Sequence, residues 1–165
     1  MPVSFLPATA TLRRWCALVP LLLVAALALS MVQAPSADAF TQRERKVRHG
    51  LAVAKNQVGD PYRYGARGPN SFDCSGLTSF AYGHAGLYLP RSSDAQYRFV
   101  RHIQKRNIRR GDLMFFYSSG GVYHVGIFLG RDNGSAYILH ASRPGTVVHR
   151  DRVWTTRWRA GTLRR

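Results

Sequence analysis

One cysteine and two histidines in this 165-residue chain combine the residue types that thiol chemistry requires. Cys74 becomes a nucleophile once its thiol loses a proton, and an imidazole is the usual group that accepts that proton. His124 and His140 lie in the second half of the chain, where one imidazole could take the thiol proton while the other orients it. His149 is an alternative third member. The residue types therefore point to nucleophilic catalysis by a thiol.

The helix that must position Cys74 is predicted by apolar residues at helical spacing, namely Leu77, Phe80, Ala81 and Ala85. Gly86 stands where a helix C-terminus favours glycine, and Asp73 is a suitable N-cap. Cys74 would then lie at a helix N-terminus, where the helix dipole stabilises an anion. We therefore expect the pKa of its thiol to be below the ordinary value. The alternative is that Cys74 is a small buried hydrophobic residue.

The histidines are predicted to lie on strands, because the pattern of the second half is that of short apolar runs separated by turns. The expected strands are residues 113–117, 124–129, 136–141 and 146–153. The turn at residues 130–135 makes a hairpin of the middle two, which brings His124 and His140 side by side. The same residues leave a zinc site of Cys74, His124 and His140 open as an alternative.

The first half is predicted to be helical, which makes the fold class α+β. A first helix is expected over residues 41–57, before the turn at residues 59–61. Ser93 with Gln96 fits a capping box, so a short helix is expected over residues 94–100. The basic stretch that follows, as far as Arg110, is expected to be a loop.

Residues 1–39 have the features of a secretory signal. Arg13 and Arg14 precede the apolar run 17–29, and Ala37-Asp38-Ala39 has a small-x-small pattern that predicts cleavage after Ala39. A retained membrane anchor is the alternative. Cleavage leaves one domain, residues 40–165, in a secreted or periplasmic protein associated with the cell wall. Cys74 would be its only cysteine, and an unpaired thiol in an exported chain favours a reactive group.

The formal net charge of +16 predicts attraction to polyanions. The sequence has no zinc-finger spacing, RNA-recognition signature or glycine-rich phosphate loop, so specific nucleic-acid binding is not expected. Anionic cell-wall polymers are the partners that an exported basic surface would meet.

Six short motifs, in this order, resemble the NlpC-type cell-wall cysteine peptidases. They are Gly59-Asp60-Pro61-Tyr62-Arg63-Tyr64-Gly65, Phe72-Asp73-Cys74-Ser75-Gly76-Leu77, Leu89-Pro90-Arg91-Ser92, Gly111-Asp112-Leu113, His124-Val125-Gly126-Ile127 and His140-Ala141. The resemblance implies a papain-like fold, with N-terminal helices packed on an antiparallel sheet. It also implies a monomeric peptidase that cuts peptidoglycan stem peptides, at the bond between γ-D-glutamate and a diamino acid, with no metal or organic cofactor.

The resemblance also implies roles for single residues. Cys74 would be the nucleophile, His124 its base and His140 the group that orients the base. Tyr62 and the Cys74 backbone N–H would stabilise the oxyanion. Four residues would line the substrate cleft, namely Asp73, Ser75, Arg91 and Ser92. In relatives specific for stems with a free amino end, the aspartate beside the cysteine pairs with that amine.

Two other functions stay open at this point. The same papain-like site could serve an amidase or acyltransferase acting on another substrate, or the domain could be a catalytically silent, basic wall-binding module. The chain has Tyr64-Gly65-Ala66 where the family often has Trp-Gly-Gly, and its turn after residue 130 is extended. Neither departure touches Cys74, His124 or His140.

Overall fold

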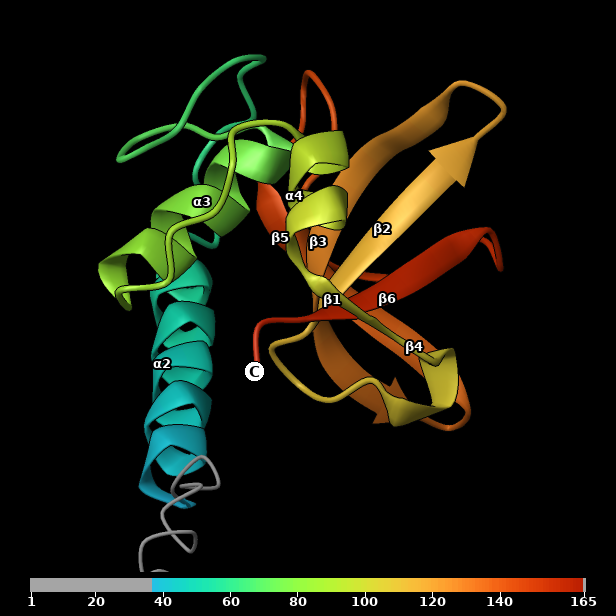
Figure 1. The fold of residues 1–165 in the computed structure, drawn as a ribbon. Coiled ribbons are helices and arrows are strands. Elements are labelled where there is room, and N and C mark those ends of the chain that lie inside the picture. The colour runs from blue at the N-terminus through green and yellow to red at the C-terminus, as the bar shows by residue number, and fades with distance from the viewer. Residues whose placement is uncertain (1–36, 165) are drawn as a thin grey trace, which may run out of the picture. The chain divides into compact units, whose positions relative to one another are not determined.

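The computed structural model describes residues 37–164, with side chains from Thr41 onward (Figure 1). The helices come first, α2 (Ala37–Lys55), α3 (Cys74–His84) and α4 (Ser93–Phe99). The strands and one 3₁₀ turn follow, in the order β1 (Arg101–Ile103), η1 (Lys105–Asn107), β2 (Leu113–Ser118), β3 (Gly121–Asp132), β4 (Ser135–Ala141), β5 (Val148–Arg152) and β6 (Trp158–Thr162). The strands form one six-stranded antiparallel sheet with the order β1-β6-β2-β3-β4-β5. The α+β prediction is therefore confirmed.

The predicted signal segment lies outside the described residues, apart from its last three positions, which fall in the first turn of α2. Cleavage after Ala39 and a retained anchor thus both stay predictions. Among the described residues, no helix has the length and apolar character required to cross a membrane.

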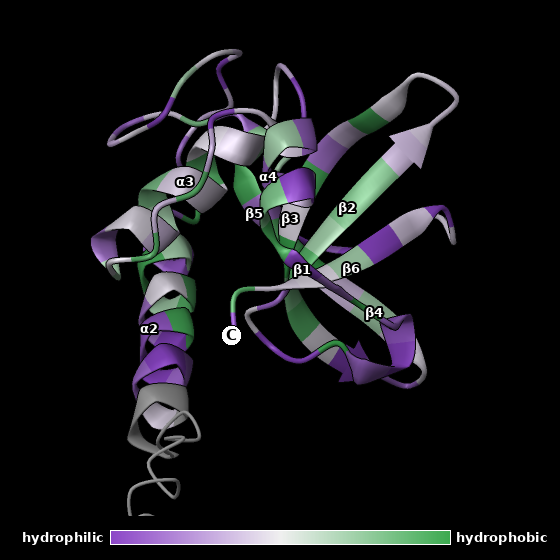
Figure 2. Ribbon diagram, in the orientation of Figure 1, coloured by the Kyte–Doolittle hydropathy of each residue, from purple (hydrophilic) through white to green (hydrophobic). Residues whose placement is uncertain are grey.

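Both faces of the sheet are buried at β2, which explains the continuous apolar run in its sequence. Leu113 and Phe115 face the helices and join the larger core cluster with Leu77 of α3. Met114 and Phe116 point to the opposite face and pack in a second cluster. Figure 2 shows the hydrophobic residues concentrated along this strand. The sheet centre is therefore a rigid support for the strands that carry the histidines.

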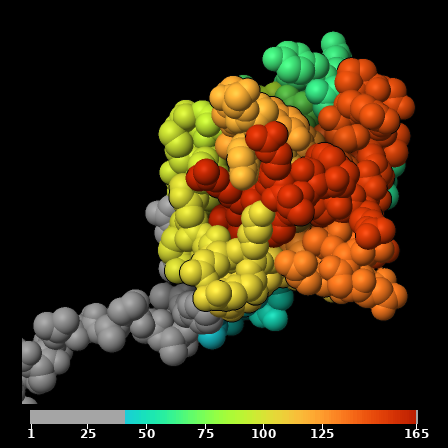
Figure 3. Space-filling view, turned by 90° about the vertical axis from the view of Figure 1, so that its right-hand side faces the viewer, coloured from blue at the N-terminus to red at the C-terminus, as the bar shows by residue number. Residues whose placement is uncertain are grey.

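Two strands, β1 and β6, lie where no strand was predicted. The basic stretch expected to be a loop contains β1, which pairs with β6, and β6 also pairs with β2. Figure 3 shows the C-terminal segment in red beside the yellow segment that contains β1. Gly161 interrupts the pattern of β6 because an added Cβ would stand 2.3 Å from Val100 and 2.9 Å from Phe115. The close approach of Val100 and Phe115 requires a glycine at this position, and the glycine breaks the apolar pattern by which a strand could have been predicted.

The short helix α4 begins one residue earlier than predicted, and its cap is a different serine. Ser92 is the N-cap and its hydroxyl accepts a hydrogen bond from Ala95 N–H, whereas Ser93 is the first helical residue. Gln96 is fully buried and forms no capping box. Its side chain instead accepts a hydrogen bond from Thr78 Oγ1 (2.7 Å) and donates to the Ser75 (3.0 Å) and Pro90 (2.9 Å) carbonyls. Gln96 therefore ties α4 to the start of α3.

Candidate active site

The start of α3 is fixed by Asp73, which is its N-cap as predicted. The Asp73 carboxylate accepts a hydrogen bond from Gly76 N–H at 2.6 Å. Gly76 is required by space, because an added Cβ would stand 2.0 Å from the Ala66 carbonyl oxygen. The loop can thus close against the first turn of the helix. This contact leaves Cys74 as the first residue of α3, partly exposed at the mouth of a cleft.

His124 and His140 are neighbours, as the predicted hairpin required. Ile127 pairs with Leu139 across β3 and β4, which makes the two histidines diagonal partners on one face. His124 Nε2 lies 2.9 Å from His140 Nδ1, and the two residues are only 6% and 1% exposed. Gly126, one residue before Ile127, lies opposite His140, and an added Cβ there would stand 3.0 Å from the Cβ of His140.

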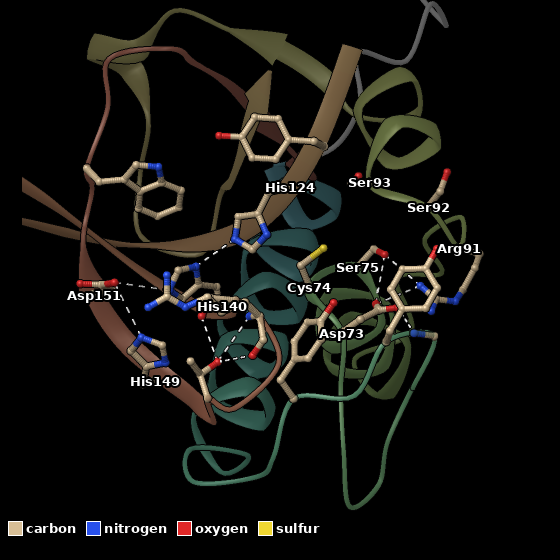
Figure 4. A pocket seen from close by; sticks show the side chains of 18 of the residues that line it. Asp73, Cys74, Ser75, Arg91, Ser92, Ser93, His124, His140, His149 and Asp151 are labelled. Atoms are coloured by element: carbon tan, nitrogen blue, oxygen red, sulfur yellow. Dashed lines mark hydrogen bonds and ion pairs between the residues drawn. The ribbon is translucent and has the colours of Figure 1, made fainter. Parts of the chain in front are cut away.

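One cleft of about 910 Å³ brings together every residue that the sequence singled out for catalysis or substrate binding. Figure 4 shows Cys74 between the histidine pair and the Asp73–Arg91 side of the cleft, with the second ring nitrogen of His124 turned toward the thiol. The predicted residues that line the cleft are Tyr62, Asp73, Cys74, Ser75, Arg91, Ser92, His124 and His140.

Burial sets the protonation states of the cleft. It raises the pKa of the Cys74 thiol, and the Asp73 charge adds to the rise, although hydrogen bonding from the Val125 and Ser75 backbone opposes it. The expectation of a lowered pKa is therefore wrong, because desolvation of the thiolate outweighs the hydrogen bonds that stabilise it. Burial also lowers the pKa of His124 to about 3, helped by His140. The resting site thus pairs a neutral thiol with a neutral imidazole.

His140 is also held neutral near pH 7. Burial lowers its pKa to about 4, and the neighbouring His149 lowers it further while Asp151 opposes the shift. Tyr62 stays protonated, because burial first, and then the Cys74 and Asp73 charges, raise the pKa of its phenol. A protonated phenol in this cleft can donate a hydrogen bond to a developing oxyanion.

Asp73 and Arg91 form an ion pair that shapes the other side of the cleft. Asp73 Oδ1 accepts hydrogen bonds from Arg91 (3.0 Å) and Ser75 (3.3 Å), and Oδ2 accepts from Gly65 N–H (3.0 Å) and from Arg91. Burial alone would raise the pKa of Asp73, but the hydrogen bonds from Arg91, Gly76 and Gly65 hold it below its ordinary value. Both oxygens have protein partners, so the arrangement does not fit the expected pairing of Asp73 with a substrate amine.

Within residues 37–164, one group of histidine, cysteine and acidic side chains is close enough to share a metal ion, namely His140, His149 and Asp151. Cys74 is not part of it, so the structure does not assemble the alternative zinc site of Cys74, His124 and His140.

Trp154 is a site residue that the sequence did not assign beyond packing. Its ring stacks on Phe116, with centroids 4.4 Å apart and planes at 10°, and lies 5.9 Å from His124 and 5.6 Å from His140. It covers the histidine pair on the side of the cleft. Trp154 lies outside the regular strands, so no hydrophobic period marked it.

Comparison with known proteins identifies the family. Residues 59–164 match the NlpC/P60 family model, and the chain belongs to this family. It is 38% identical over 122 residues to a probable endopeptidase of Corynebacterium glutamicum (strain R), covering 72% of this chain and 54% of the relative. It is also 40% identical over 106 residues to the probable endopeptidase p60 of Listeria welshimeri, covering 59% of this chain and 20% of the relative. The chain thus spans about half of the first relative and a fifth of the second.

Solved structures show the same papain-like fold. The P60 domain of an antigen from M. avium subspecies paratuberculosis superposes with a TM-score of 0.64 at 30% identity, covering 74% of this chain and 98% of that domain. The peptidoglycan hydrolase RipB of Mycobacterium tuberculosis gives a TM-score of 0.66 at 27% identity, covering 86% and 78%. RipD of the same organism, a non-catalytic NlpC/p60 domain protein adapted to peptidoglycan binding, gives 0.59 at 30% identity, covering 71% and 96%.

Proposed function

We propose that this protein is an exported cysteine endopeptidase that hydrolyses an amide bond in peptidoglycan stem peptides. The observation that carries the proposal is the placement of Cys74 at the mouth of a cleft beside the coupled pair of His124 and His140. Family membership and the similarity to a peptidoglycan hydrolase supply the substrate class. The bond between γ-D-glutamate and a diamino acid is proposed from the resemblance of the motifs.

The histidine pair can work in only one of its two tautomeric arrangements. When His124 Nε2–H donates to His140 Nδ1, the second nitrogen of His124 carries a lone pair and can accept the thiol proton. His140 then holds the His124 ring in orientation and stabilises the imidazolium that forms. The reverse arrangement would put a proton on His124 Nδ1, which faces Cys74 (Figure 4), and would leave no base.

The reaction then proceeds through an acyl-enzyme. The Cys74 sulfur attacks the scissile carbonyl carbon while its proton moves to His124, and the oxyanion accepts hydrogen bonds from Tyr62 and the Cys74 N–H. That N–H lies in the first turn of α3, where backbone donors have no intrahelical partner. The His124 imidazolium returns the proton to the leaving amine as the carbon–nitrogen bond breaks. Water, activated by the same imidazole, then releases the acid and regenerates the thiol.

The ion pair of Asp73 with Arg91 bears on the choice of substrate. Because Arg91 already neutralises Asp73, we propose that the enzyme does not require a free amino end on the stem. Stems that are still attached to glycan through their first residue are then substrates as good as free peptides.

Mass spectrometry of products from defined muropeptides tests the function. We expect cleavage of one stem amide by the purified protein and none by Cys74→Ala, and equal rates on stems with free and acylated amino ends. Products from a different amide or ester would favour the amidase or acyltransferase. A folded protein that binds peptidoglycan without cutting any stem would favour the wall-binding module, the role for which RipD is a structural precedent.

The +16 charge supports a further part of the proposal, in which the basic surface binds anionic wall polymers. Such binding should weaken between low and high salt, because ions screen exposed charges. Retention on cell walls that does not change with salt would contradict it.

A further inference from the structure

His140, one of the histidine pair, also belongs to a group of three side chains that could bind a metal ion, together with His149 and Asp151. His149 on β5 is the register partner of His140 on β4, and Asp151 lies two residues further along β5, on the same face as His149. His140 Nε2 is 3.9 Å from Asp151 Oδ2, and His149 Nε2 is 3.7 Å from the same oxygen. The three ligand atoms all lie within 4.8 Å of one another. Figure 4 shows His149 and Asp151 close to His140.

His140 Nε2 is the feature of this group that calls for a ligand. Its side chain is only 2% exposed, and the nitrogen is buried without a hydrogen-bond partner. Buried polar atoms in folded proteins nearly always have a partner, so this nitrogen calls for an ion or a water beside it. The nitrogen points at His149 and Asp151 rather than into the hydrophobic core.

The other two members present lone pairs to the same point. His149 Nδ1–H donates to the Val147 carbonyl at 2.7 Å, which places the lone pair of that ring on Nε2. Asp151 Oδ1 accepts from Arg152 N–H at 2.8 Å, which leaves Oδ2 for another partner. A hydrogen bond on the far side of a ligand is how proteins orient histidine and carboxylate ligands of metals.

We propose that His140, His149 and Asp151 form a binding site for a divalent transition metal, and that zinc fits it best. Two imidazole nitrogens and one carboxylate oxygen suit zinc, whereas magnesium and calcium prefer sites made of oxygen alone. Tetrahedral zinc holds such ligands at about 2.0–2.2 Å, so the three atoms must approach one another slightly. The side chains of His149 and Asp151 are 34% and 51% exposed and can make this movement.

The charge of the surroundings limits the affinity. Arg143 and Arg152 line the same cleft, and the whole chain carries a net charge of +16. The site supplies three protein ligands and leaves a fourth position open to the cleft. Three ligands with an open position are typical of exchangeable zinc rather than of a closed structural site.

Metal binding would switch off the base, a consequence that rests on the proposed function. A metal on His140 Nε2 requires the proton of that ring to lie on Nδ1, so Nδ1–H donates to His124 Nε2. His124 must then carry its own proton on Nδ1, on the side of Cys74. Overall, His140 Nε2 gives a proton to water, the proton between the rings crosses to His140, and His124 Nδ1 takes a proton from water. The ring can no longer accept the thiol proton.

Zinc binding is tested first in the full chain carrying Cys16→Ser and Cys74→Ala, which removes both thiols as competing ligands. Equilibrium dialysis with metal analysis should give one zinc per chain. His149→Asn and Asp151→Asn, each added to Cys74→Ala, should weaken binding about tenfold or more. His49→Asn, on the exposed surface of α2, is the matched control and should change nothing. Absence of binding, or binding that both site variants retain, would overturn the proposal.

The tautomer is tested by NMR in the same Cys74→Ala chain. Zinc should move the proton of His124 from Nε2 to Nδ1, which the ¹⁵N shifts of the ring report. Bound zinc with His124 still protonated on Nε2 would overturn the switch.

Activity gives the third test, in the chain with Cys74 intact. Zinc should inhibit stem cleavage, a chelator should restore it, and His149→Asn should lose most of the sensitivity relative to its own metal-free rate. Equal inhibition of both proteins would mean that zinc binds the thiol, which contradicts the switch. If no stem is cleaved at all, the proposed function fails while dialysis and NMR still decide on the metal site.

Discussion

The protonation state of Cys74 leads to a prediction that separates two models of this active site. We expect iodoacetamide to alkylate Cys74 slowly at neutral pH and faster as the pH rises. The thiolate is the species that reacts, and burial raises the pKa of this thiol. A preformed pair of thiolate and imidazolium would need a His124 that is charged at neutral pH, yet burial lowers the pKa of His124 to about 3.

The size of the effect follows from the thiolate fraction. An ordinary cysteine, with a pKa of about 8.5, is a few per cent thiolate at pH 7. Cys74 should have less than that and react more slowly than free cysteine. Its alkylation rate should rise about tenfold per pH unit from about pH 6 to 8.5, without a plateau. Thiols activated by a helix N-terminus or an imidazolium have pKa values of about 3.5–7.5 and would react at a nearly constant rate over the upper part of this range.

The assay is the pH dependence of alkylation, followed by intact mass in a chain with Cys16→Ser, so that Cys74 is the only thiol. His124→Ala is the matched control. Removal of a neutral imidazole should leave the profile nearly in place, whereas loss of an ion pair would move it upward by more than one pH unit. A flat rate between pH 5 and 8 that depends on His124 would refute the reasoning.

Three further predictions concern the groups that support the site. Arg91→Met should lower the free energy of unfolding by about 1–3 kcal/mol at pH 7. Because the folded-state pKa of Asp73 is lowered, this loss should shrink as the pH falls below about 4. Urea unfolding at pH 7 and at pH 3 measures both values. Trp154→Ala should lower kcat about 10- to 100-fold in stem cleavage by loosening the histidine pair, and Trp154→Phe should recover most of it. Gly126→Ala, whose Cβ would stand 2.4 Å from a β4 side chain, should cost about 1–3 kcal/mol in thermal unfolding. Gly83→Ala is the control, because apart from its chain neighbours and the α3 backbone nothing lies within 4 Å of the added Cβ, and it should not destabilise the protein.

The parts of the site that follow from local pattern could be predicted from the sequence. The N-cap at Asp73 places Cys74 at the start of α3, and the hairpin between β3 and β4 brings His124 and His140 together. Both relations depend on neighbours in sequence or on one turn. Period and turn chemistry are enough to fix such relations.

The parts that depend on distant packing could not be predicted. Strand β6 pairs with β1 and β2, and the segment after it is held by Arg164, which pairs with Glu44 of α2 and with the buried Asp112. All of these partners are far away in the sequence. Trp154 is held beside the histidines by stacking on the ring of Phe116, a contact between residues far apart in the sequence. The direction of the Cys74 pKa also required the degree of burial, which a helix N-terminus in the sequence does not reveal.

Burial acts on the thiol and on the imidazole in the direction that favours neutral forms, and this has a consequence for the mechanism. Separating charge between Cys74 and His124 in the resting cleft is unfavourable, so in the proposed mechanism the proton moves as the sulfur attacks. The negative charge then passes to the carbonyl oxygen, where Tyr62 and the Cys74 N–H can receive it. The donors stabilise charge at the position where it develops in the transition state rather than on the free thiol. A thiol that stays protonated is also less prone to oxidation, which would suit Cys74 in the proposed exported enzyme.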